Sequence, residues 1–311
     1  MPVDPTVAYR RVRQLSGSGP TITPAKAHAV AIGLRRAADQ APAIVAQQTE
    51  LFDHLEDVQS KPVSVLARPG WAQAAALSVS PFLDNLVRDS KVQSRVVSEE
   101  LGIALAVMAP RILGQYDPFA LTALPGQGLP IEGRLLLIAP NVFDFSTDWN
   151  LDIRDVQLFV CVHEFTHAFQ FTAAPWLKDV LVSRVSSALA AMDEGMMEEE
   201  LDGIMAIMTV LEGHAEYVMN TVPIARIPSR KRITAAIKSR RQSGSQISKF
   251  VKNLLGFDLK VNQYEDGEKF VDHVVRLAGH EGFNRVWETP MNLPTPDELK
   301  DPQSWCQRVL S

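Results

Sequence analysis

Residues 152–171 read DIRDVQLFVCVHEFTHAFQF, and the interpretation of the whole chain starts from this stretch. Asp152 suits the position just before a helix, and Asp155 follows three residues later, as in a capping box with Asp in place of Glu. The run that follows is mostly apolar, and Pro175 lies shortly beyond it. The stretch therefore predicts a largely buried helix over residues 156–171.

This helix carries the pattern His163-Glu164-Phe165-Thr166-His167. Residues four apart project from one face of a helix, so His163 and His167 can bind a single metal ion. Glu164 lies about 100° round the helix, where it borders the metal and can accept a proton from metal-bound water. The alternative is two histidines on an ordinary helix. In an apolar helix, however, each unpaired polar group would cost about 1–3 kcal/mol, and zinc would supply the missing partner.

A second segment, LEGHAEY at 211–217, is the candidate source of a third ligand, because catalytic zinc usually has three protein ligands and one open position. Glu212 and Glu216 share a helix face. We expect Glu212 to bind zinc and Glu216 to hydrogen-bond a ligand histidine, although the pair alone would also fit solvated carboxylates. His214 lies about 200° from Glu212 and competes as third ligand, oxyanion donor or packing residue. Gly213 would permit close approach of the two helices.

The combination resembles the glutamate zincins (gluzincins), whose zinc site is two histidines and a glutamate. More narrowly, the chain is similar to an actinobacterial family of zincin-like hydrolases, known as DUF2342 zinc-dependent metalloproteases or as coenzyme F420 biosynthesis-associated proteins. The matching stretches keep their order over roughly residues 110–300, namely LGQYD at 113–117, APN at 139–141, VHEFTHAFQF at 162–171, PWL at 175–177, LEGHAE at 211–216, QYxxGxxFV at 263–271 and NLPT at 292–295. The resemblance implies a mostly helical zincin-like fold and peptide hydrolysis.

These observations predict a zinc-dependent hydrolase, most simply a metallopeptidase, in which Glu164 is the general base. Zinc and one further donor would stabilise the oxyanion. The candidate donors are Tyr217, His214 and Tyr264, and their sequence positions do not decide among them. The alternative is a non-catalytic zincin-fold protein that holds a structural metal and binds a protein partner. Glu164 favours the enzyme, because a structural site needs no base.

The predicted fold class is mainly α (α+β), with a small β-sheet or hairpin near residues 134–143. The apolar run 135–139 is the best strand candidate, whereas residues 68–70 and 114–118 are predicted to be turns. Helices are also expected over segments that include 203–220 and 262–279. The chain is divided into an N-terminal arm (1–23), a helical N-terminal region (24–110) and a zincin-like catalytic region (111–311). The alternative is that the last two regions form one continuous domain.

Composition narrows the function classes. The 311 residues include seven histidines and only two cysteines, which excludes a Cys-rich zinc site and leaves histidine and carboxylate as ligands. A net charge of -5 argues against nucleic acid as a partner, and the basic stretch 226–260 is interpreted as a solvated helix face. The sequence contains no apolar run of about 18–20 residues and no signal-peptide core, so we expect a cytoplasmic protein without a membrane segment. The expected partner is a peptide or protein substrate, and the sequence does not indicate an oligomeric state.

Overall fold

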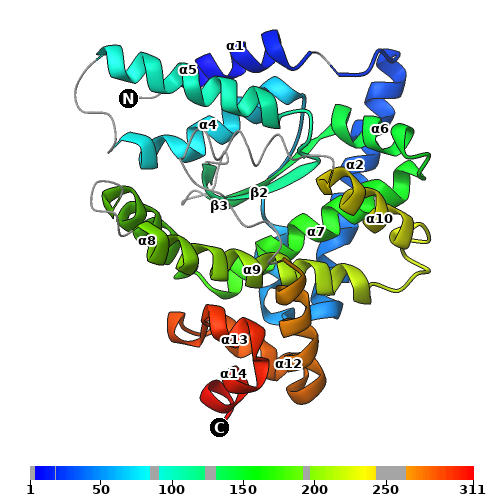
Figure 1. Ribbon diagram of the computed structural model, residues 1–311. Coiled ribbons are helices and arrows are strands. Elements are labelled where there is room, and N and C mark those ends of the chain that lie inside the picture. Colours follow the sequence, from blue (N-terminus) through cyan, green and yellow to red (C-terminus); the bar gives the residue numbers. More distant parts are fainter. Residues whose placement is uncertain (1–3, 18, 85–90, 123–130, 192–196, 243–263) are drawn as a thin grey trace. The chain divides into compact units, whose positions relative to one another are not determined.

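The computed structural model describes residues 4–17, 19–84, 91–122, 131–191, 197–242 and 264–311, and it shows many helices and one small sheet (Figure 1). The predicted mainly-α fold class is therefore confirmed. The longer helices are α1 (Pro5–Leu15), α2 (Pro24–Thr49), α4 (Arg68–Asp84), α5 (Lys91–Met108), α6 (Ala139–Asp148), α7 (Ile153–Ala173), α8 (Leu177–Ala191), α9 (Met197–Thr221), α10 (Arg230–Gln242), α12 (Tyr264–Asn284) and α14 (Pro302–Val309). Short helices are η1 (Phe52–His54), α3 (Leu55–Gln59), η3 (Arg285–Trp287), η4 (Pro290–Asn292) and α13 (Pro296–Lys300).

The chain forms two compact units, and each is assembled from separate segments. The first unit comprises Met1–Gln40, Lys61–Cys161 and Pro223–Leu259, and the second comprises Ala41–Ser60, Val162–Val222 and Lys260–Ser311. The helices α2 and α7 each contain a boundary between the units. The predicted division of the chain at residues 23 and 110 stays a prediction.

The sheet belongs to the first unit and has the strand order β1-β3-β2. The central strand β3 (Ile131–Ile138) pairs in parallel with β1 (Val63–Leu66) and antiparallel with β2 (Gly114–Thr122). Residues 135–138 of β3 are fully buried, which explains why this strand reads as a continuous apolar run. The sheet was predicted near 134–143, but β3 ends at Ile138 because Pro140 lies in the first turn of α6, a position that suits proline.

The expected turn at residues 114–118 was wrong, because these residues belong to the edge strand β2. Asp117 is only 1% exposed, and its carboxylate accepts hydrogen bonds from Ser78 Oγ (2.5 Å) and from Arg134 Nη2 (3.0 Å). The pairing register shifts between Asp117 and Leu121. An edge position with such an irregularity tolerates Pro118, which has no backbone N–H to donate.

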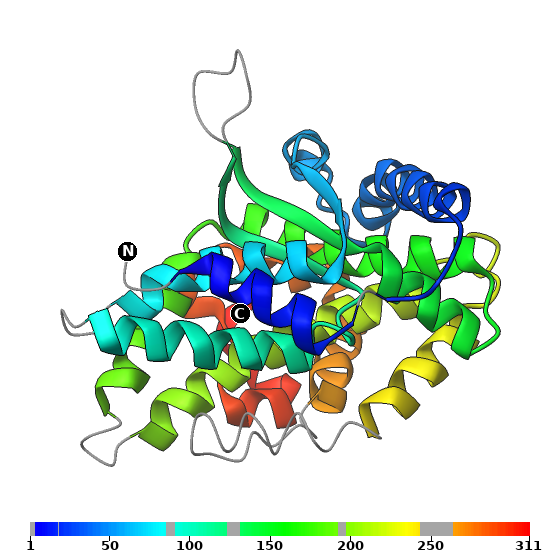
Figure 2. The same cartoon turned by 90° about the horizontal axis from the view of Figure 1, so that it is seen from above.

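The segment expected to be an N-terminal arm (1–23) contains α1, which is packed against other helices. In α1, Ala8 and Val12 are buried in a cluster with Trp71 of α4 and Leu105 of α5. The two views agree that α1, in dark blue, lies alongside α5 (Figure 2). The predicted turn at residues 68–70 is also wrong, since these residues form the first turn of α4.

Part of the basic stretch 226–260 forms α10, while residues 243–260 lie outside the described part of the chain. Among the helices that the structure describes, none combines the length and the apolar character needed to cross a bilayer. The predicted cytoplasmic location and the expected lack of nucleic-acid binding stay predictions.

Candidate metal centre

As the sequence predicts, Asp152 lies just before α7, which begins at Ile153, but Asp155 does not complete the expected capping box. Asp152 Oδ1 accepts hydrogen bonds from the backbone N–H groups of Arg154 (2.7 Å) and Asp155 (3.4 Å). The carboxylate of Asp155 instead accepts hydrogen bonds from the backbone N–H and the hydroxyl of Ser229, both at 2.7 Å. The acid that was expected to cap its own helix therefore connects the start of α7 to the segment before α10.

Within α7, one face is left partly accessible while its neighbours are buried. Phe165 and Phe169 are at most 2% exposed, whereas His163, Glu164 and His167 are intermediate in burial. Burial of the phenylalanines fixes the rotation of the helix, because the hydrophobic contribution of such a side chain is about 1.5–3 kcal/mol. The consequence is that the two histidines project together from a half-buried surface.

Glu212 of α9 completes a cluster with these two histidines. Its Oε2 lies 3.7 Å from His163 Nε2, and its Oε1 lies 3.6 Å from His167 Nε2. One potential ligand atom from each residue can be chosen so that all three lie within 4.8 Å of one another. The side chains of His163, His167 and Glu212 are 23%, 14% and 24% exposed, so the cluster is accessible to water.

The cluster fits a zinc ion in both chemistry and spacing. Two imidazoles and one carboxylate form a common catalytic zinc ligand set. Tetrahedral ligands at roughly 2.1 Å from zinc lie about 3.4 Å from one another. The two His-to-Glu212 separations of 3.6 and 3.7 Å exceed this value only slightly. With one ligand atom from each residue lying within 4.8 Å of the others, the three side chains would have to close in only slightly around a zinc ion.

Gln170, a residue that the sequence reasoning did not single out as functional, contacts this cluster from behind. Its side chain is fully buried. The Oε1 atom lies 2.8 Å from His167 Nδ1, while Nε2 donates to the Leu211 carbonyl at 2.8 Å and lies 3.1 Å from His214 Nδ1. The available signal was its position three residues after His167, which places both side chains on one helix face.

His214 lies behind His167 and is separated from it by Gln170. It is 1% exposed, and its ring centroid lies 4.9 Å from that of Phe283 and 5.5 Å from that of Trp287. Burial, together with the charges of His280 and His167, lowers the pKa of His214 to about 3. Among the described residues, none pairs with its buried Nε2.

The other predicted site residues lie on two helices of the second unit. Glu216 is half-buried one turn beyond Glu212 on α9. Tyr217 makes an edge contact with His280 of α12, with ring centroids 6.0 Å apart, and burial raises its pKa. Tyr264 is the first residue of α12, and its side chain lies outside the described part of the structure.

The glycine beside Glu212 is a point of close approach between helices, as expected, but the partner is α12 rather than the helix of the histidines. A Cβ atom at Gly213 would lie 2.6 Å from the Cα of Gly267 and would also overlap the Gly267 carbonyl carbon. A Cβ at Gly267 would in turn overlap the Thr209 carbonyl. Both positions therefore exclude any side chain, and α9 and α12 pack side by side through them (Figure 1).

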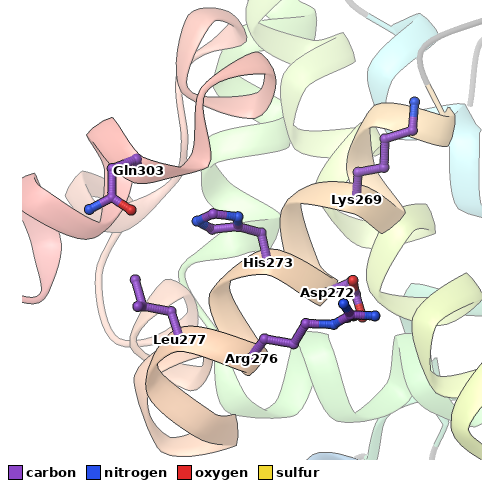
Figure 3. Close-up of a pocket in the computed structure, with 6 residues that line it drawn as sticks. All are labelled: Lys269, Asp272, His273, Arg276, Leu277 and Gln303. Carbon is purple, nitrogen blue, oxygen red and sulfur yellow. Dashed lines mark hydrogen bonds and ion pairs between the residues drawn. The ribbon is translucent and has the colours of Figure 1, made fainter.

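A solvent-open hollow of about 410 Å³ occurs elsewhere in the second unit, on α12 and α14. Figure 3 shows His273 at its centre, between Gln303 of α14 and the other α12 side chains. Asp272 and Arg276 on its edge pair with each other at 3.0 Å. None of the predicted site residues lines this hollow, since they lie on α7, on α9 and at the start of α12.

Comparisons with known proteins add to this geometry. A family model described as "zincin-like metallopeptidase" matches residues 3–200 and 196–306. A solved structure from Chloroflexus aurantiacus, described as "a putative hydrolase with a novel fold", superimposes with a TM-score of 0.74 and 27% sequence identity, over 98% of each chain. The curated proteins include no match. The narrower resemblance to the actinobacterial DUF2342 family and its F420 association stays a prediction.

Proposed function

Because the chain belongs to the zincin-like metallopeptidase family, we propose that it is a zinc-dependent peptidase that hydrolyses peptide or amide bonds. We assign His163, His167 and Glu212 as the protein ligands of zinc, which is the ligand set of the glutamate zincins. The observation that carries this proposal is the convergence of two α7 imidazoles and one α9 carboxylate, with their ligand atoms within 4.8 Å. The Chloroflexus structure, described as that of "a putative hydrolase", supports the same class of reaction.

Glu164 has the position and chemistry of the general base in this proposal. It directly follows His163 and lies on the half-buried part of α7. Zinc bound at the cluster would lower the pKa of a water molecule in its open position towards about 7 and polarise the substrate carbonyl. The Glu164 carboxylate would take the proton of that water and deliver it to the leaving amine.

For the oxyanion donor we retain Tyr217 and Tyr264 and give His214 another role. The Nδ1 atom of His214 is hydrogen-bonded to Gln170, and its ring is buried against two aromatic side chains. A donor must reach the oxygen on which charge develops. Replacing each tyrosine by phenylalanine separately would decide between Tyr217 and Tyr264. The variant that lacks the donor should have a much lower kcat and a nearly unchanged KM.

The test of the proposed function is metal analysis combined with a peptide-library assay on the wild type and on Glu164→Gln. This substitution keeps the size of the side chain and removes its basic carboxylate. We expect the wild type to retain about one zinc per chain and to cleave peptides. Glu164→Gln should retain the zinc and lose turnover by at least about 10²-fold, the lower range for a general base.

Three results would each contradict a part of the proposal. If the purified wild type neither contains zinc nor binds added zinc, the ligand assignment is wrong. If wild type and Glu164→Gln both bind zinc and neither cleaves a peptide, the metal is structural and the alternative of a non-catalytic partner-binding protein is favoured. Equal cleavage by both proteins would show that Glu164 is not the base.

A further inference from the structure

We propose that Gln170 is a positioning residue that fixes His167 in the Nδ1–H tautomer, so that its Nε2 lone pair is directed towards the metal. The inference rests on the proposed zinc site but concerns hydrogen atoms that can be observed without zinc. It is carried by a continuous set of three contacts, from the Leu211 carbonyl and His214 through Gln170 to His167.

The Leu211 carbonyl fixes the orientation of the Gln170 amide. The two ends of a glutamine amide have the same shape, so their assignment must come from the hydrogen-bond network. A backbone carbonyl can only accept hydrogen bonds. The atom 2.8 Å from the Leu211 oxygen must therefore be the Gln170 NH₂ group. The opposite end of the amide, which contacts His167, must then be the carbonyl oxygen.

The orientation of the amide decides the tautomer of His167. An amide oxygen accepts and does not donate, so the 2.8 Å contact requires a hydrogen on His167 Nδ1. A neutral imidazole carries only one such hydrogen, and Nε2 is then free to act as a ligand. This Nε2 is the atom that faces Glu212 at 3.6 Å. In the alternative tautomer, a hydrogen on Nε2 would occupy the position needed for metal binding.

The same reasoning assigns the tautomer of His214. The second hydrogen of the Gln170 NH₂ group points to His214 Nδ1 at 3.1 Å, so that this nitrogen accepts and Nε2 carries the hydrogen. His214 stays neutral there, because its ring is buried against Phe283 and Trp287. A protonated His214 would place a second donor against the amide hydrogens. The neutral buried ring thus reinforces the orientation that Leu211 imposes.

Gln170 also connects the two helices that supply the ligands. It lies three residues after His167 on α7, and its partner Leu211 immediately precedes Glu212 on α9. Loss of the amide would therefore affect both the direction of the His167 lone pair and the placement of Glu212. Residues that hold ligand histidines in this way typically change metal affinity or activity by about 10–100-fold when they are replaced.

The first experiment measures the tautomers in the metal-free wild type by long-range ¹H–¹⁵N correlation NMR of ¹⁵N-histidine-labelled protein. It is recorded near pH 8, above the ordinary histidine pKa of about 6.5. The signals are assigned with His167→Gln and His214→Phe variants. We expect a hydrogen on Nδ1 of His167 and on Nε2 of His214. A hydrogen on Nε2 of His167 in the wild type would overturn the proposal without recourse to any Gln170 variant.

The second experiment compares Gln170→Met with Gln157→Met. Gln157 is a matched control, since it is another buried glutamine of α7 whose amide donates to a backbone carbonyl, that of Val30 at 3.1 Å. We expect Gln170→Met to populate the second tautomer of His167 and to weaken zinc binding, measured by chelator competition, by about 10–100-fold. Gln157→Met should keep the wild-type tautomer and zinc affinity even if its unfolding temperature falls.

The readouts separate this inference from the proposed function. Unchanged zinc affinity and an unchanged His167 tautomer in Gln170→Met would refute the positioning role while leaving peptidase activity intact. Weaker zinc binding in that variant, together with a wild type that cleaves no peptide, would support the positioning role and count against the proposed function. If Gln170→Met does not fold, the wild-type tautomers still decide the question.

Discussion

At the scale of single residues, pattern and position identified different parts of the candidate centre. The pair His163 and His167, with Glu164 between them, could be predicted because helical spacing alone brings the two rings to one face. Glu212 could be predicted because a catalytic zinc site usually has a third protein ligand. Gln170 was not, since an amide gives no ligand-like spacing, and its role depends on a carbonyl 41 residues away in the sequence.

The choice between the two α9 carboxylates gives a prediction at this scale. Glu212→Gln should reduce zinc affinity by at least about 10-fold, because it removes the charged ligand atom that lies near both histidines. The matched variant Glu216→Gln, one helical turn away, should lose less. Zinc stoichiometry and chelator competition on both purified proteins provide the measurement. The opposite ranking would make Glu216 the ligand and Glu212 its supporting residue.

At the scale of helices and strands, the sequence predicted an element correctly where its apolar residues follow a single helical pattern or where a glycine interrupts the helix. The helix expected over 156–171 is α7, and the one expected to end at 279 is interrupted there by Gly279, whose φ of 71° leaves the helical region. The strand β2 was missed because Asp117 and Pro118 look like a turn. Only their tertiary contacts, above all the ion pair of Asp117 with Arg134, make them part of a sheet.

The contact between α9 and α12 gives a prediction for these elements. Gly213→Ala should lower the free energy of unfolding by about 1–3 kcal/mol or more, because the added methyl group overlaps the Gly267 backbone. As a control, Gly70→Ala on α4 meets only side-chain atoms of Leu66, the nearest at 3.6 Å, and should be neutral or stabilising by up to about 1 kcal/mol. Denaturant unfolding of both variants would measure the difference, and equal stabilities would contradict the close approach.

At the scale of the whole molecule, the sequence predicted the mainly-α fold class but not the way in which the chain is shared between compact units. Each unit combines segments from the beginning, middle and end of its range, such as Ala41–Ser60 with Lys260–Ser311. Two of the boundaries between the units fall inside the continuous helices α2 and α7. A helix that continues across a boundary shows no loop or change in composition there, so the sequence does not mark it. The assembly depends on long-range packing, which single-sequence patterns do not report.

The stability of the whole molecule should depend on pH through His214. Its pKa is about 3 in the folded chain and about 6.5 when unfolded, so between these values the unfolded chain binds more protons. The contribution of His214 to the free energy of unfolding is then fully present above about pH 6.5. It decreases as the pH falls towards 3, with a limiting slope of about 1.4 kcal/mol per pH unit.

The measurement is denaturant unfolding across this pH range with a zinc chelator present, because metal binding by histidine depends on pH as well. The variant His214→Phe keeps an aromatic ring against Phe283 and Trp287 and should show a shallower slope. Replacement of the exposed His273 by asparagine serves as the control and should retain the wild-type slope. If His214→Phe also retains it, burial of a neutral His214 is not the cause.

The late position of α12 and η3 in the chain has a consequence for the time at which the centre is completed during synthesis. The last proposed ligand, Glu212, is made 75 residues before Trp287, which packs against His214. At about 5–20 residues per second, a ribosome needs roughly 4–15 s to add that stretch. A nascent chain therefore holds all three proposed ligands before it holds the aromatic residues that enclose His214, so the order of translation itself delays a finished centre until η3 has been made.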